Sequence, residues 1–167
     1  MVKRKKNKTV MLAISAVAVI LGIVAIVMMF VPSVGIKNAN TTILKKTVFT
    51  GMEVTFGYQT VFGLTITVFE FSVMNLISYI LVAGGVVFTI LGALGRGSKF
   101  AGFIAAGAFI VAGVFFFLMP QYTVINSEAT KHLGNLNENL KLGAGAIVSA
   151  VCSLVAGAAQ LYRVLFR

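Results

Sequence analysis

The sequence predicts a mainly α-helical membrane protein: a four-helix transmembrane bundle with a small antiparallel β-sheet in the first extracytoplasmic loop. Three observations support this fold class. The 167 residues are 59% hydrophobic, with a mean hydropathy of +1.00. Only 11% of them are charged, against about 25% in soluble domains. The apolar residues also form four long blocks with the charges gathered between them, so we expect lipid to cover most of the surface.

The first apolar block, Val10–Val31, follows a basic stub at residues 1–8. At about 1.5 Å per residue it is long enough to cross a hydrocarbon core of about 30 Å. A cleaved signal peptide is the competing interpretation, because signal peptides also begin with basic residues. Their apolar region is usually only about 7–15 residues long, and Val31–Ile36 has no small-x-small cleavage pattern. We therefore expect an uncleaved transmembrane helix.

Three further apolar blocks follow, none with a charged side chain: Val73–Leu94, Phe100–Met119 and Leu142–Tyr162. Each is long enough for one crossing. The turn at Gly95–Lys99 is so short that the second and third helices must form a tight antiparallel pair. We therefore expect a single membrane domain over residues 1–167, with two longer connections at 32–72 and 120–141.

Lysine and arginine predict the orientation of the bundle. Short segments rich in these residues stay on the cytoplasmic side, and the stub, the turn and the C-terminus are such segments. All four acidic residues lie in the two longer connections, which we therefore place outside: Glu53, Glu70, Glu128 and Glu138. Both termini are then cytoplasmic, in a multi-pass protein of the plasma membrane. The net charge of +10 comes from cations at the ends of the apolar segments, which is the pattern that orients a membrane protein. We therefore expect the lipid bilayer and not nucleic acid as a partner.

The first outer connection, 32–72, carries the signals of a small sheet. Apolar and other residues alternate along Met52–Gly57 and again along Leu64–Phe69, which is typical of half-buried strands. Gly57–Gly63 between them could turn the chain into a hairpin. A third strand is expected within Thr41–Phe49. Since an isolated hairpin is marginally stable, we expect three or four strands resting on the outer ends of the helices.

The second outer connection, 120–141, is polar and rich in asparagine. Ser127–Thr130 is expected to open a short helix with Ser127 as its N-cap. The single histidine, His132, falls on or after that turn. An isolated loop histidine is more often solvated than a ligand, so we assign it no function.

Two resemblances come from these features. Four helices, inside termini and a long β-rich first outer loop resemble the claudin-type tetraspan architecture. Claudins carry a Trp, a Gly-Leu-Trp motif and two Cys in that loop, whereas this chain has Phe62-Gly63-Leu64, no Trp and its one cysteine at Cys152, so junction formation is not implied. The run FGYQTVFGL, with FEFSVMNLISYIL after it, resembles small four-span membrane proteins of Gram-positive bacteria over residues 49–82, which implies no particular activity.

Polar residues near the second helix form the candidate site. Asn75, Ser78 and Tyr79 have the spacing of one helix face, with Glu70 just outside, so the four could line a small outer vestibule. The alternative is that Asn75 and Ser78 bond to a neighbouring helix while Tyr79 anchors at the membrane interface. Gln160 is interpreted in the same way, as a polar residue at a helix interface.

Small residues recur at the spacing of a helix face. The fourth block carries Ser149, Ser153 and Gly157, and small residues at this spacing let helix backbones approach closely in lipid. We expect this stripe to pack inside the bundle, with a homodimer face as the alternative.

The inventory of reactive side chains is thin. The chain has no aspartate, one cysteine and one histidine, so we predict no metal, no cofactor, no catalytic residues and no enzyme. We expect a protein that acts through contacts of its outer loops, chiefly Thr47–Phe71, with a membrane-protein partner, an envelope component or another copy of itself. The alternatives are a small channel or transporter subunit, and a protein that binds lipid or a small molecule.

Overall fold

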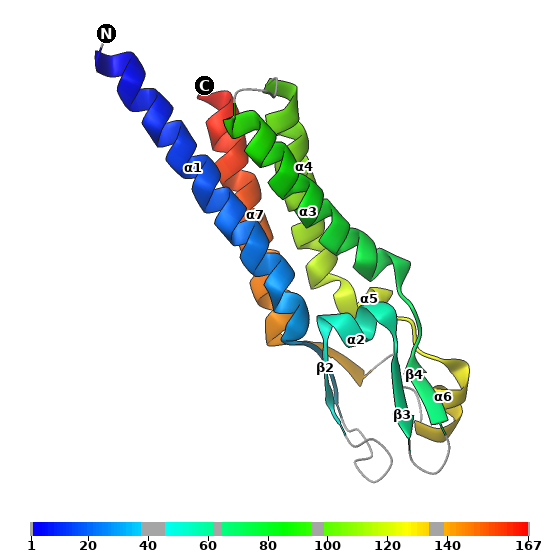
Figure 1. Cartoon of the computed structure of the whole chain (residues 1–167). Helices are drawn as coiled ribbons and strands as arrows, with labels where there is room; N and C mark the ends of the chain where they lie inside the picture. The colour runs from blue at the N-terminus through cyan, green and yellow to red at the C-terminus, as the bar shows by residue number, and fades with distance from the viewer. Residues whose placement is uncertain (1, 38–45, 62–64, 95–98, 134–138, 167) are drawn as a thin grey trace.

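A computed structural model of the chain describes residues 2–37, 46–61, 65–94, 99–133 and 139–166. Four long helices run side by side, and a smaller mixed layer closes one end of them (Figure 1). The four helices are α1 (Val2–Val27), α3 (Val73–Ala93), α4 (Lys99–Phe117) and α7 (Ala144–Leu165). Both termini lie at the other end of the bundle (Figure 1). We call the smaller layer, formed by the described parts of 32–72 and 118–143, the cap.

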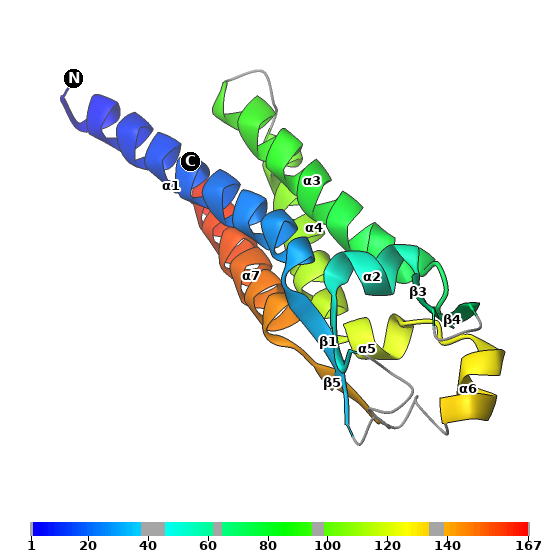
Figure 2. The same cartoon turned by 60° about the horizontal axis from the view of Figure 1, so that its bottom comes forward.

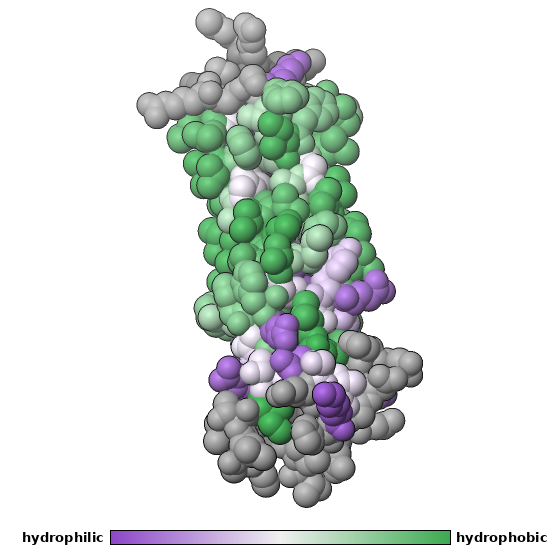
Figure 3. All heavy atoms as spheres, turned by 90° about the vertical axis from the view of Figure 1, so that its right-hand side faces the viewer, coloured by the Kyte–Doolittle hydropathy of each residue, from purple (hydrophilic) through white to green (hydrophobic). Residues whose placement is uncertain are grey.

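Each long helix is long and apolar enough to cross a membrane, as the sequence predicts. The membrane-length stretches are Thr9–Phe30, Val73–Ala93, Lys99–Phe117 and Ala144–Leu165. Large apolar side chains stay exposed along them, for example Ile20, Ile80 and Val151. Figure 3 shows a broad apolar band over one face of the bundle. A surface of this kind is consistent with a multi-pass membrane protein.

The fourth helix is offset from the predicted span. It begins at Ala144, because Leu140–Leu142 forms strand β5, and it continues to Leu165. Arg163 is therefore inside the helix and only 4% exposed. Its Nη1 donates to Gln160 Oε1 at 3.1 Å, and its guanidinium lies against Gly92 of α3. The buried arginine was not predicted, because a span drawn from hydropathy alone stops before the first charged residue.

The small residues of α7 face the interior of the bundle. Ser149 and Ser153 are fully buried, and the Ser149 hydroxyl donates to the Ala25 carbonyl of α1 at 2.9 Å. Gly157 lies so close to α4 that an added Cβ would be 3.2 Å from the Ala106 carbonyl oxygen. The stripe therefore packs α7 against α1 and α4 within one chain, as its spacing predicts.

Two antiparallel sheets build the cap. In the first, β1 (Pro32–Ile36) lies between β2 (Val48–Thr50) and β5 (Leu140–Leu142). In the second, β3 (Tyr58–Val61) pairs with β4 (Thr65–Phe69). Figure 2 shows β1 and β5 side by side, so the two outer connections share one sheet. A small antiparallel sheet in the first connection is confirmed, while the strand contributed by the second was not predicted.

The predicted strand over Met52–Gly57 is wrong. Residues Gly51–Phe56 form helix α2, and a capping box starts it. Glu53 N donates to the Thr50 hydroxyl at 3.3 Å, and Thr50 N donates back to Glu53 Oε2 at 2.8 Å. This reciprocal pair satisfies two backbone donors that have no partner within the helix at its N-terminus. It therefore overrides the alternating pattern.

The hairpin is displaced along the chain as a result. Tyr58–Val61, predicted as part of the turn, is the first strand of the hairpin, and the second strand agrees with the prediction. Of the third predicted strand, Thr41–Phe49, the structure shows β2 from Val48 onward, and its first part lies outside the described residues.

Two short helices complete the cap, α5 (Met119–Tyr122) and α6 (Ser127–Leu133). The short helix predicted near Ser127 is confirmed, but its N-cap is the preceding residue. The Asn126 carbonyl accepts from Thr130 N at 3.2 Å, and Ser127 is already helical.

The cap has an apolar core of its own. Phe49 is fully buried and contacts the rings of Phe69 and Tyr58 edge-on, with centroids 4.8 and 5.1 Å apart. Val34 of β1 and Val54 of α2 are also fully buried. Because Phe49 and Phe69 belong to different sheets, their contact joins the two sheets into one layer.

Candidate functional site

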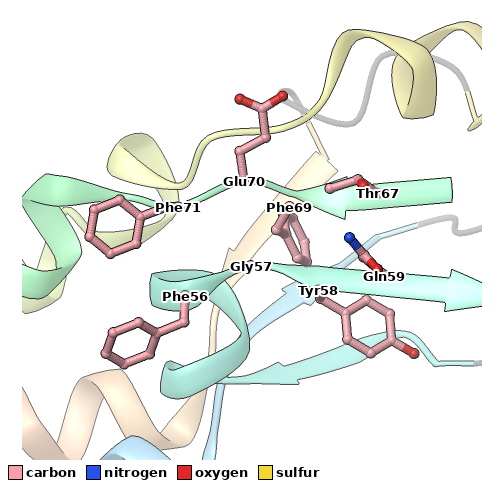
Figure 4. A pocket seen from close by; sticks show the side chains of 8 residues that line it. All are labelled: Phe56, Gly57, Tyr58, Gln59, Thr67, Phe69, Glu70 and Phe71. Carbon is pink, nitrogen blue, oxygen red and sulfur yellow. The ribbon is translucent and has the colours of Figure 1, made fainter.

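An open groove of about 510 Å³ lies on the cap where α2, β3 and β4 meet (Figure 4). Its lining comes from one short stretch of chain: Phe56, Gly57, Tyr58, Gln59, Thr67, Phe69, Glu70 and Phe71. All of these residues fall within Thr47–Phe71, the region that the sequence favours for contacts. The register of β3 against β4 shifts between Tyr58 and Gln59, so the ladder is irregular at the groove.

Gly57 makes the sharp change of direction at the floor of the groove. Its φ is 103°, a conformation that side chains with a Cβ rarely adopt. Its N–H donates to the Glu53 carbonyl at 3.0 Å and closes α2. An added Cβ would also lie 3.0 Å from the Phe69 carbonyl oxygen. The groove therefore depends on glycine at this position.

Glu70 stands exposed at the rim of the groove. Asn126 Nδ2 donates to its Oε1 at 2.7 Å, and the Glu70 N–H donates to the Val124 carbonyl at 2.9 Å. Within the described part of the chain, Glu70 forms no salt bridge; the ion pair found there is Lys46 with Glu53 at 2.7 Å. The second connection thus orients a carboxylate that no described cation neutralises.

Phe56 and Phe71 form the wall of the groove next to the bundle. They are 51% and 49% exposed, with ring centroids 6.1 Å apart. Figure 4 shows both rings on the side of the long helices, with Gln59 and Thr67 on the far side. Because Phe71 precedes the membrane-length helix that starts at Val73, the groove opens at the height where that helix begins.

The four predicted site residues fall into two places. Glu70 lines the groove, and Asn75, Ser78 and Tyr79 do not. These three are buried where the cap meets the bundle, at 0%, 0% and 6% exposure. Asn75 Nδ2 donates to the Val54 carbonyl at 3.3 Å and to Thr123 Oγ1 at 3.4 Å. Asn75 thus joins α3 to α2 and to the residue after α5.

Ser78 and Tyr79 make contacts of other kinds. The Ser78 hydroxyl donates to the Met74 carbonyl of its own helix at 3.1 Å. The Tyr79 ring meets Phe116 of α4 edge-on, with centroids 4.9 Å apart. Both side chains are therefore buried within the bundle. The outer vestibule that they would share with Glu70 stays a prediction.

A charged cluster at the start of α2 holds this helix in place. Lys46 Nζ donates to both Glu53 oxygens at 2.7 Å and lies 5.8 Å from the ring centroids of Phe49 and Tyr58. Partial burial of Glu53 raises its pKa, but the hydrogen bonds from Lys46 and Thr50 and the lysine charge outweigh burial. The net effect places the pKa of Glu53 below its ordinary value of 4.5.

Among the residues that the structure describes, no three His, Cys, Asp or Glu side chains come together as a metal site would require. Cys152 is a free thiol within α7. The sequence alone could not single out the groove wall, because Phe56 and Phe71 are unremarkable apolar residues in an apolar chain. A usable signal was the Thr50–Glu53 spacing, which marks the start of a helix. The contact from Asn126 had no local signal.

Comparison of the chain with protein-family models, with curated protein sequences and with solved structures finds no match. The resemblances to claudin-type architecture and to small four-span bacterial proteins therefore stay predictions.

Proposed function

We propose that this chain is a non-enzymatic, multi-pass protein of the plasma membrane that acts by contact, with the cap as its recognition surface. The groove beside Phe56 and Phe71 carries the proposal. It combines two half-exposed aromatic rings with a carboxylate that forms no salt bridge to a described residue. Aromatic side chains that keep an exposed face are typical anchors of recognition sites.

The folding of the cap supports this proposal. Both connections contribute to one layer with a shared sheet and a fully buried aromatic at its centre. A layer of this kind presents a fixed surface, so a partner need not order it on binding. We place the cap outside and both termini in the cytoplasm, which agrees with the charge distribution and with the termini lying at the same end.

A photo-reactive residue in the groove tests the proposal. Gln59 is exposed and lines the groove, whereas Val48 of β2 is 44% exposed and does not line it. Each position would receive a photo-crosslinking amino acid in otherwise intact protein, irradiated in native membranes. We expect defined adducts from position 59 and few from position 48. Equal or absent adducts at the two positions would contradict a contact role for the groove.

A second candidate function is a small channel or transporter subunit. One observation favours it: among the residues that the structure describes, two buried polar atoms where the cap meets the bundle have no hydrogen-bond partner, namely Thr55 Oγ1 and Asn75 Oδ1. Such atoms are usually satisfied by water, which a solute path would supply. Flux through reconstituted vesicles that survives unchanged in Asn75→Ala and Glu70→Gln would remove this candidate.

A further inference from the structure

We infer that the groove on the cap holds the ammonium-bearing headgroup of a phospholipid from the outer leaflet. This inference rests on the proposed function and names the partner of the same groove. Three features of the groove support it: its height on the bundle, its chemistry and its continuity with the apolar surface of the helices.

The height of the groove matches the headgroup layer. The membrane-length part of α3 begins at Val73, so Glu70 and Phe71 lie just beyond the end of the hydrocarbon. The headgroup layer on each side of a bilayer is about 5–8 Å thick, which spans the first few residues outside a helix. A ligand in this groove is therefore at the level of lipid headgroups.

The apolar wall of the groove continues into the exposed surface of the helices. Phe56 and Phe71 touch each other, and Val73 and Met74 next to them are 56% and 48% exposed. Met52, one turn before Phe56 on α2, is 39% exposed. Acyl chains lying along α3 would thus meet the two rings directly, and their headgroup would lie between the rings and the polar side of the groove.

The polar groups of the groove select the charge of the headgroup. Glu70 would repel a purely anionic headgroup and attract an ammonium group. One of its oxygens accepts from Asn126, and a carboxylate has capacity for further donors. The faces of Phe56 and Phe71 also favour a cation by their ring quadrupoles. Gln59 and Thr67, on the far side of the groove, offer an amide and a hydroxyl that could bond to phosphate oxygens.

Native mass spectrometry of the full chain tests this inference. The protein would be released from nanodiscs of equimolar phosphatidylethanolamine and phosphatidylglycerol, and the retained lipid would be identified. We expect phosphatidylethanolamine to predominate. Glu70→Gln should lower this preference by about tenfold, which corresponds to about 1.4 kcal/mol, because the neutral amide no longer attracts the ammonium group. Glu128→Gln removes the same charge from α6, an element other than α2, β3 and β4 that form the groove, and should leave the preference unchanged.

Competition on the unmodified chain keeps the test decisive if Glu70→Gln folds poorly. Adding phosphatidylcholine, which also carries an ammonium group, should displace phosphatidylethanolamine, whereas additional phosphatidylglycerol should not. Equal retention of both lipids by the unmodified chain, or an unchanged preference in well-folded Glu70→Gln, would overturn the inference. A protein adduct at position 59 without any lipid preference would leave the proposed contact function standing. The ammonium group would then be a lysine of a partner protein.

Discussion

At the scale of single residues, Glu53 has two partners that fix the start of α2. It closes the capping box with Thr50 and pairs with Lys46. Both interactions require the ionised carboxylate. The pKa of Glu53 is lowered below 4.5 in the folded protein, so its protonation state couples the cap to pH.

We expect the cap to lose stability in acid. A carboxyl group with a lowered folded-state pKa stabilises the fold fully above its unfolded pKa, and this contribution disappears as the pH falls through the folded value. The loss should therefore begin near pH 4.5 and grow below it. Hydrogen-exchange protection factors of the α2 amides at pH 7 and pH 3.5, in which the intrinsic pH dependence of exchange is divided out, would measure it. In Glu53→Gln the protection factors should be lower at pH 7 and should depend less on pH; an equal pH response in both proteins would contradict this assignment.

Gly57 is the residue whose backbone conformation the groove needs. Gly57→Ala should destabilise the cap by about 1–2 kcal/mol, because alanine is strained at a φ of 103°. Thermal unfolding in detergent would measure the change. Gly84→Ala in α3 is the matched control, since an added Cβ there meets nothing within 4 Å. If the two substitutions had the same effect, the strain at Gly57 would not matter.

At the scale of elements, the joint between the cap and the bundle depends on hydrogen bonds from one helix end. Ser72 is the N-cap of α3, and its hydroxyl donates to the Tyr122 carbonyl at 2.6 Å. Asn75, one turn later, reaches α2 and Thr123. The first turn of α3 thus holds parts of both connections.

Asn75→Ala should loosen this joint. The substitution leaves the Val54 carbonyl without its side-chain donor in a buried place, which costs about 1–3 kcal/mol. We expect faster hydrogen exchange in α2 and a lower thermal stability. Ser78→Ala is the control, because that hydroxyl donates to the Met74 carbonyl of its own helix and its loss should cost well under about 1 kcal/mol. Equal effects of the two substitutions would show that Asn75 does not join the elements.

At the scale of the whole molecule, the end of α3 at Ala93, the start of α4 at Lys99 and both termini lie opposite the cap (Figure 1), which allows a direct test of orientation. A cysteine replacing Gln59 should react with a membrane-impermeant maleimide on intact cells. A cysteine replacing Ser98 should react only after permeabilisation, and the native Cys152 within α7 should stay largely unreactive. Labelling of position 98 from outside would reverse the proposed topology.

The sequence by itself determined the four membrane-length helices. An apolar block of sufficient length needs no distant partner to form a helix in lipid, because all its backbone hydrogen bonds are internal. Because a helix has a fixed periodicity, the sequence also places Ser149, Ser153 and Gly157 on one helix face. The sequence further predicts strand β4 and the short helix near Ser127, where local signals agree with the fold.

Only the tertiary structure decided how the connections come together. The pairing of β1 with β5 joins segments about a hundred residues apart, and strand alternation does not name a partner. In the same way Asn126 reaches Glu70 and Asn75 reaches Val54, while Arg163 is buried against Gly92. The groove forms because the capping box starts helix α2 at residues predicted to be a strand, and the hairpin β3–β4 therefore begins later in the chain. Local patterns determine which segments are helical, whereas long-range packing decides which side chains meet.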